Sequence, residues 1–152
     1  MAPKRGLYNK TRESPVVAKV DLATTFFKRL KGLLGTKSLE EDHGLFLSPC
    51  KSIHMFGMKY AIDAVFLNKD LIVVELVENI QPGAVSGHYR DALSCLELAQ
   101  GTIKRVNLEI GDQLCWSDED LTPARNRLRN DLGQNWTFEE KTGDLVLSSK
   151  FS

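Results

Sequence analysis

The sequence has little cysteine, no excess of either charge and no long apolar run. Its 152 residues hold 20 Lys+Arg and 20 Asp+Glu, so the formal net charge is zero. A balanced charge argues against a dedicated nucleic-acid binder, which usually carries a basic excess. Because no run of about 18 apolar residues exists, we expect no transmembrane span. The first 19 residues hold no apolar segment of the kind that a secretory signal needs, and we therefore interpret the chain as cytoplasmic.

The three cysteines are Cys50, Cys95 and Cys115. An odd number, with no Cys-x-x-Cys pair, suits neither a disulfide framework nor a zinc site, and it predicts reduced, buried thiols. The glycine-rich phosphate loop, G-x-S-x-G and H-E-x-x-H are all missing, which weighs against nucleotide enzymes, standard hydrolases and zincins. We therefore expect no cofactor and no metal ion.

The composition is that of a globular protein. Hydrophobic residues make up 42% and charged residues 26% of the chain, which is enough apolar surface to build a core. We predict a flexible N-terminal arm over residues 1–19, in which residues 16–20 could form an edge strand. A β-rich core domain would follow over residues 20–116, and a C-terminal extension over residues 117–152.

The C-terminal extension has its own local signals. Thr122-Pro123 is a good start for a short helix, and Arg125 and Arg129 would share one face of it. That face could contact an acidic partner or phosphates, although a solvated face is the simpler interpretation. Apolar residues on both sides of residues 141–144 predict a terminal hairpin.

One stretch near the N-terminus has helical periodicity. Between Asp21 and Gly35 the apolar residues recur at steps of three and four, as on one face of an amphipathic helix: Leu22, Ala23, Phe26, Phe27, Leu30, Leu33 and Leu34. Asp21 would be the N-cap and Gly35 the C′ residue. Gly32 inside this helix would cost about 1 kcal/mol against alanine, which suggests that another backbone passes close to it.

The remaining signals are β. Residues 62–67 and 71–77 are apolar runs separated by Asn68-Lys69-Asp70, which predicts a central hairpin. Further strands are expected over residues 44–47, 93–99 and 113–116, with one helical turn at 103–106. The expected fold is α+β and mainly β: a compact small antiparallel or mixed sheet, or a partly open barrel, with one amphipathic N-terminal helix and short helical turns.

Cys50 and His54 form the most suggestive local cluster. They could be a thiol nucleophile and its base, or two metal ligands. In a strand, however, residues four apart are separated by about 13 Å, so direct contact would need a bend, or a partner from elsewhere such as His88 or Cys95. The simpler interpretation makes Cys50 a core residue and His54 a hydrogen-bonded histidine near the surface.

Two acidic residues lie inside apolar strands. An ionised carboxylate at Asp63 or Glu97 must be paired or hydrogen-bonded, because burying it bare costs several kcal/mol. Asp63 could accept backbone N–H groups and fix the preceding turn, or it could line a pocket with His54 and Arg29. Arg29 could also pair with Glu97. Met58 belongs to a soft apolar segment that suits either a core or a binding surface.

An ordered series of short motifs resembles the domain-of-unknown-function family numbered 192. The series comprises Arg29-Leu30-Lys31-Gly32-Leu33-Leu34, Gly44-Leu45-Phe46, residues 52–67 (SIHMFGMKYAIDAVFL), Pro82, Leu96-Glu97-Leu98-Ala99, Gly101 and Gly111-Asp112. It spans residues 20–116. Ala61 stands where the family usually has proline, and Gly57 where an aromatic is frequent, which affects the shape of that loop more than the fold. The resemblance implies a compact, mainly β domain with one or two helices. It implies no agreed activity, and some members of the family are exported.

Two functions stay open at this stage. The first is a binding or accessory module for a small molecule, peptide or protein partner, with candidate ligand-binding residues Arg29, His54, Met58, Asp63 and Glu97. The second is a thiol-dependent or acid/base enzyme that uses Cys50, His54 and Asp63. A third, weaker hypothesis is a structural protein that works through the Arg125–Arg129 helix and the terminal hairpin.

Overall fold

The structure is a computed structural model that describes residues 5–118, 136–141 and 144–149. The chain divides into two compact units, residues 1–121 and 122–152. In the second unit, β8 (Trp136–Lys141) pairs antiparallel with β9 (Asp144–Ser149). The helix expected after Pro123, with Arg125 and Arg129, lies outside the described residues. No helix in the described part of the chain is long and apolar enough to cross a membrane.

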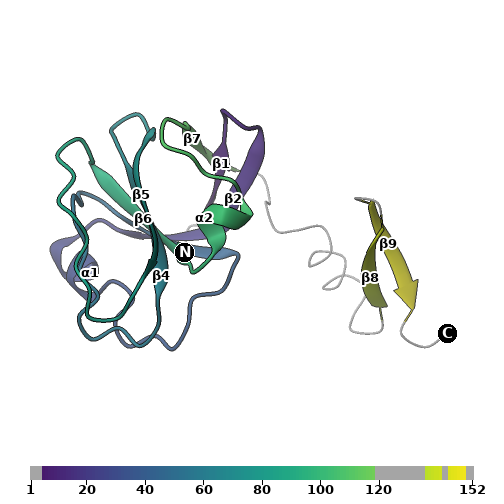
Figure 1. Ribbon diagram of the computed structural model, residues 1–152, viewed down its shortest axis with the longest axis horizontal. Helices are drawn as coiled ribbons and strands as arrows, with labels where there is room; N and C mark the ends of the chain where they lie inside the picture. The colour runs from purple at the N-terminus through teal and green to yellow at the C-terminus, as the bar shows by residue number, and fades with distance from the viewer. Residues whose placement is uncertain (1–4, 119–135, 142–143, 150–152) are drawn as a thin grey trace. The chain divides into compact units, whose positions relative to one another are not determined.

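The first unit is a curled sheet of seven strands (Figure 1). Its strands, in chain order, are β1 (Arg5–Asn9), β2 (Ser14–Ala23), β3 (His43–Leu47), β4 (Ile62–Leu67), β5 (Val73–Ile80), β6 (Ser94–Ala99) and β7 (Leu114–Ser117). Their spatial order is β5-β4-β6-β3-β2-β1-β7. The sheet is mixed, because β2 and β3 run parallel while the other pairs are antiparallel.

The two edges of the sheet approach each other at one end, which gives a half-barrel. An isolated bridge joins Ile72, just before β5, to Gln113, just before β7. The backbone N–H of Val73 donates to the Asp112 carbonyl and that of Leu114 to the Leu71 carbonyl, both at 2.8 Å. The expectation of a mainly β fold is therefore confirmed, and the structure combines two of the expected alternatives, because its sheet is mixed and curls into a half-barrel.

The amphipathic N-terminal helix is the main error of the sequence analysis. Leu22 and Ala23 belong to β2, and only the six residues of α1 (Phe26–Lys31) are helical. Thr25, not Asp21, is the N-cap, and its hydroxyl accepts from the Lys28 N–H at 3.2 Å. Gly32 ends the helix with φ +49°, a conformation that glycine adopts without steric cost. Pairing with β3 outweighs the local helical pattern at the start of the segment.

The predicted flexible N-terminal arm is wrong for the residues that the structure describes. β1 and β2 lie inside the sheet, and Leu7 is fully buried. Residues 16–20 do form part of a strand, but β2 is flanked by β1 and β3 and is not at an edge. Buried apolar side chains of both strands, such as Leu7, Val16 and Val17, hold this segment in place.

The strands of the second half form as the sequence predicts. β4 and β5 are an antiparallel pair, and all six residues of β4 are buried. The short helix α2 (Thr102–Arg105) forms at the expected turn. The side chains of β4 alternate between two apolar clusters, because successive residues of a strand point to opposite faces.

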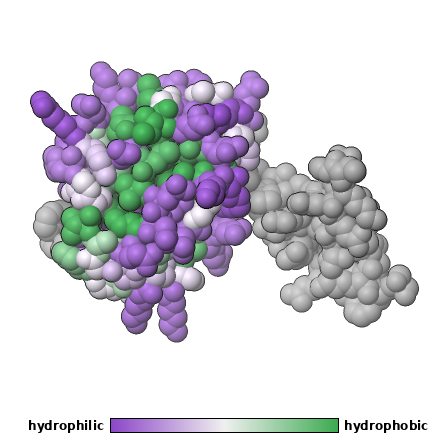
Figure 2. Space-filling model, in the orientation of Figure 1, coloured by the Kyte–Doolittle hydropathy of each residue, from purple (hydrophilic) through white to green (hydrophobic). Residues whose placement is uncertain are grey.

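These two clusters lie on the two faces of the sheet. Cluster A contains Val65 and Leu67 of β4 with Leu96 and Leu98 of β6. Cluster B contains Ile62, Ala64 and Phe66 of β4 with Cys95 of β6, covered by loop residues such as Ile53, Met55 and Ala92. Apolar residues also reach the surface, where Figure 2 shows them gathered toward the centre of one face with hydrophilic residues around them. The sheet thus buries apolar side chains on both faces, and a polar group on either face needs its own partners.

Candidate functional site

A pocket of about 340 Å³ lies between α1, loop residues 49–58 and β6. Its polar lining includes Arg29, Cys50, His54 and Glu97. Its apolar lining includes Leu33, Leu34, Ile53, Met55 and Met58. Lys51 fixes the loop, because its Nζ donates to the carbonyls of Arg90 at 2.6 Å and Ala92 at 2.7 Å. This volume is within the range of pockets that hold small ligands.

Arg29 gives the pocket a positive charge. Its Nη1 donates to the Pro49 carbonyl at 3.1 Å, which fixes the guanidinium against the loop. Its Nε is buried and has no hydrogen-bond partner among the described residues. A buried N–H without an acceptor costs free energy, so this atom is ready to donate to an acceptor that enters the pocket.

Glu97 gives the pocket a neutral carboxyl group. The residue is 7% exposed and projects from β6 on the same side as Cys95. Burial, and then the electrostatic effect of Cys50, raise the pKa of Glu97 to about 8. Near neutral pH the group is therefore mostly protonated, and it can both donate and accept a hydrogen bond.

Cys50 and Cys95 bring two thiols together beside Glu97. The Cys50 Sγ donates to the Ser52 carbonyl at 3.2 Å, and the Cys50 N–H donates to the Leu93 carbonyl of the segment leading into β6 at 2.8 Å. The Cys95 side chain is completely buried and interacts with that of Cys50. Cys50 itself is half-buried and lines the pocket.

His54 and Met58, two of the candidate ligand-binding residues, also line the pocket. His54 is exposed and stacks on Phe56 with a ring-centroid distance of 5.0 Å. Its backbone forms an isolated bridge with Val85. The Cys50 thiol is directed to Ser52 and Cys95 instead of His54, so the arrangement does not present a Cys50–His54 dyad.

Asp63 does not line this pocket. It is fully buried, and its two oxygens accept the backbone N–H groups of Asn79 at 2.9 Å and Ile103 at 3.0 Å. It lies opposite Leu98, on the cluster A face of the sheet, while Glu97 pairs with Ala64 on the cluster B face. The sheet separates the two carboxyl groups, so the expected joint site of Asp63 with Arg29, His54 and Glu97 does not form.

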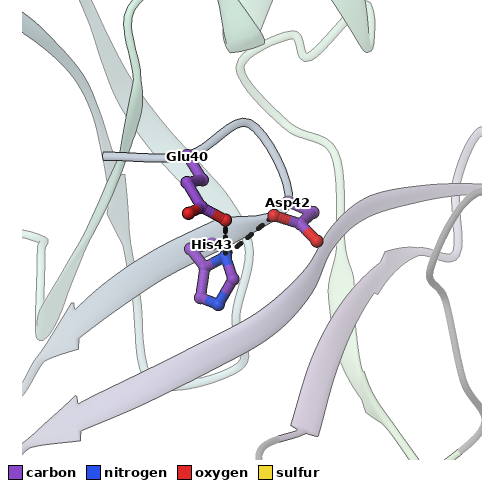
Figure 3. A group of neighbouring side chains, drawn as sticks. All are labelled: Glu40, Asp42 and His43. Carbon is purple, nitrogen blue, oxygen red and sulfur yellow. Dashed lines mark hydrogen bonds and ion pairs between the residues drawn. The ribbon is translucent and has the colours of Figure 1, made fainter. Parts of the chain in front are cut away.

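A second polar cluster joins Glu40, Asp42 and His43 (Figure 3). The His43 Nδ1 lies 2.8 Å from Asp42 Oδ1 and 3.3 Å from Glu40 Oε2. The ligand atoms of the three residues lie within 4.8 Å of one another, so they have the spacing of a metal site. One imidazole nitrogen facing two carboxylates also has the geometry of a local ion pair, which explains the cluster without a ligand.

The sequence patterns do not identify Ile53, Met55 and Leu33 as pocket walls, and they indicate Cys95 only as one of two remote partners for Cys50. The signal for Cys95 was the alternation in residues 93–99, which places Cys95 and Glu97 on the same side of the strand. Nothing local indicates that the loop after β3 folds over this side of β6.

The comparisons with known proteins concern most of the chain. Residues 7–116 match the family model DUF192, described as "Uncharacterized ACR, COG1430". A UPF0127 protein of Thermococcus sibiricus is 35% identical over 124 residues, which cover 78% of this chain and 79% of that protein. A UPF0127 protein of Pyrococcus furiosus is 30% identical over 116 residues, covering 73% of this chain and 97% of that protein.

Two solved structures have a similar fold. A protein of unknown function from Novosphingobium aromaticivorans has a TM-score of 0.65 at 21% identity, covering 74% of this chain and 84% of that one. A putative transcription regulator from Sinorhizobium meliloti has a TM-score of 0.66 at 24% identity, covering 75% and 92%. At these identities the likeness shows the fold alone. With the family model matched over residues 7–116, the chain belongs to the uncharacterised DUF192 (UPF0127) family.

Proposed function

We propose that the protein is a binding module, and that the pocket beside α1 takes a small molecule, or a side chain of a peptide partner, that carries a carboxylate on an apolar body. The observation that carries the proposal is the buried, unpartnered Nε of Arg29 at this pocket. A carboxylate would supply the missing acceptor and neutralise the guanidinium.

The charges of the pocket favour an anionic ligand. Arg29 is a cation, whereas Glu97 is mostly neutral near pH 7 because its pKa is raised to about 8. The neutral Glu97 carboxyl can hydrogen-bond a ligand carboxylate without repelling it. An ionised Glu97 would repel the same ligand, so we expect binding to weaken as the pH rises through about 8.

The walls favour a ligand with an apolar part. Met55 is 1% and Ile53 7% exposed, so both are fixed in the core while they line the pocket. Met58 and Leu33 are half-buried and complete an apolar surface beside the guanidinium. Methionine side chains adapt to different ligand shapes, which suits a site for a short aliphatic or aromatic acid.

The test uses the full chain and two probes of equal shape, hexanoate and its neutral analogue hexanamide. Amide and methyl NMR shifts are followed during titration of each probe. We expect hexanoate to shift the signals of Leu33, Ile53 and Met55, and hexanamide to bind at least about tenfold more weakly, because it lacks the charge-assisted bond to Arg29.

Arg29→Gln should weaken hexanoate binding about tenfold or more, whereas the control Lys28→Gln should leave it unchanged. Lys28 is exposed on the same helix and does not line the pocket. Shifts confined to residues 117–152, or equal binding of both probes by the wild type and Arg29→Gln, would contradict the proposal.

A further inference from the structure

The paired thiols at this pocket are not needed for carboxylate binding. Cys50 is partly accessible from the pocket, while Cys95 is inaccessible behind it and packs in cluster B. The backbone bond from the Cys50 N–H to the Leu93 carbonyl, 2.8 Å long, fixes the loop beside the strand that carries Cys95. A half-buried cysteine at a pocket, packed against the cluster that contains a buried one, is the arrangement of an attacking and a resolving thiol.

We propose that Cys50 and Cys95 are a redox-active dithiol, in which Cys50 attacks a low-molecular-weight disulfide that enters the pocket and Cys95 resolves the mixed disulfide. The proposal goes beyond ligand binding, because it requires only the two sulfurs and access to Cys50. Cys115, which is half-buried in β7, has no part in it.

The chemistry balances in two exchanges with a disulfide RSSR. The Cys50 thiolate attacks one sulfur of RSSR, a bond from Cys50 Sγ to that sulfur forms, the S–S bond of the reagent breaks, and RS⁻ leaves and takes the proton that Cys50 released. The Cys95 sulfur then attacks Cys50 Sγ, the intramolecular disulfide forms, and the second RS⁻ leaves with the proton of Cys95. In sum, two protein thiols are oxidised to one disulfide, and RSSR is reduced to two RSH.

The environment assigns the order of attack. The interaction with Cys95 first, then the backbone of Ser52 and the charge of Arg29, lower the pKa of the Cys50 thiol although burial opposes them. Burial, and then the Cys50 thiol, raise the pKa of Cys95 well above its usual range. The thiolate is the nucleophile in disulfide exchange, so Cys50 reacts first and Cys95 stays protonated until the mixed disulfide has formed.

The test exposes the reduced full chain to oxidised glutathione at neutral pH and follows each cysteine by mass spectrometry of non-reduced peptides. The wild type should lose two hydrogens and show a Cys50–Cys95 linkage with little retained glutathione. Cys95→Ser should instead accumulate one glutathione on Cys50, and Cys50→Ser should show neither product. Circular dichroism checks that each variant folds, and Cys95→Ala replaces Cys95→Ser if the buried hydroxyl prevents folding.

Cys115→Ser is the matched control and should behave as the wild type does. In a second measurement, iodoacetamide should modify Cys50 at least about threefold faster than Cys115 at neutral pH. Stable glutathione on Cys50 of the wild type without the intramolecular linkage would overturn the resolving role of Cys95. Preferential reaction of Cys115 would overturn the proposal as a whole.

Discussion

The carboxylate of Asp63 accepts a hydrogen bond of 3.0 Å from the backbone N–H of Ile103, a residue 40 positions later in the chain. Its other oxygen accepts from the Asn79 N–H at 2.9 Å. One side chain of β4 thereby fixes both the end of β5, where Asn79 has φ +52°, and the first turn of α2. Asp63 is thus a structural residue of the half-barrel, which explains why a fully buried acid sits in an apolar strand.

Asp63→Asn should lower the free energy of unfolding by about 2–4 kcal/mol, because the amide can offer only one oxygen to two N–H donors, of which that of Ile103 is buried. The measurement is equilibrium urea unfolding at neutral pH, with Asp91→Asn at an exposed position as the control. Equal stability of the two variants would mean that the two hydrogen bonds of Asp63 contribute nothing.

Glu97 should make the stability of the protein fall as the pH rises. Its pKa is about 8 in the folded chain against an ordinary value of 4.5, so between these values the folded state holds a proton that the unfolded state has released. Within this window each rise of one pH unit lowers the free energy of unfolding by up to about 1.4 kcal/mol. Across the whole window the loss amounts to a few kcal/mol. Below this pH window the stabilisation by protonated Glu97 is fully present, and above the window it is lost.

Glu97→Gln keeps the neutral form at every pH. Urea unfolding at about pH 5 and pH 9 should therefore show a flatter dependence for this variant, and its advantage over the wild type should grow toward pH 9. Glu78→Gln, at an exposed position of β5, is the control and should follow the wild type. Parallel curves for Glu97→Gln and the wild type would contradict the raised pKa.

Asp112 should have the opposite effect on stability, which should fall as the pH is lowered. Burial alone would raise the pKa of its carboxyl, but bonds from Asn9 at 3.0 Å, the Glu109 N–H at 3.0 Å and Arg12 at 2.8 Å together lower it. The stability that it contributes is present above its ordinary pKa of 3.8 and is lost as the pH falls through the lower folded value.

Asp112→Asn should cost about 1–2 kcal/mol at neutral pH and should flatten the loss of stability in acid. Urea unfolding from neutral pH to about pH 3 measures both effects. Asp70→Asn, in an exposed turn, should reproduce the wild-type profile. An unchanged acid profile in Asp112→Asn would show that other groups govern acid unfolding.

Gly44 should tolerate no side chain, because β3 and β6 pack closely there. A Cβ at this position would lie 3.1 Å from Leu98 Cδ2 and 3.2 Å from the Glu97 carbonyl, so Gly44→Ala should cost about 1–3 kcal/mol. In the comparison variant Gly87→Ala the atoms nearest to the new Cβ, 2.9–3.0 Å away, belong to the end of the Tyr89 side chain and not to the backbone. Thermal unfolding should therefore give a clearly lower Tm for Gly44→Ala than for Gly87→Ala.

The errors of the sequence analysis have one physical origin. The periodicity of residues 22–34 is helical, yet Leu22 and Ala23 pair with β3 instead, because backbone bonds to neighbouring strands outweigh a weak local preference. Gly32 indicated an unusual backbone conformation, but it ends α1 with φ +49° and does not mark a close helix contact.

Four of the five candidate site residues do line one pocket, since Arg29, His54 and Met58 lie on segments that fold over the side of β6 carrying Glu97.

The sequence by itself determined the strands of the second half, the turn at α2 and the need of Asp63 for fixed partners, because alternation, turn residues and the cost of a buried charge are local properties. Only the tertiary structure decided which polar groups meet. The register of β4 against β6 places Asp63 opposite Leu98 and Glu97 opposite Ala64, and a shift of one residue would exchange their faces. The meeting of Cys50 with Cys95 likewise depends on a loop that crosses the sheet, and contacts between such distant segments are set by packing that no local pattern encodes.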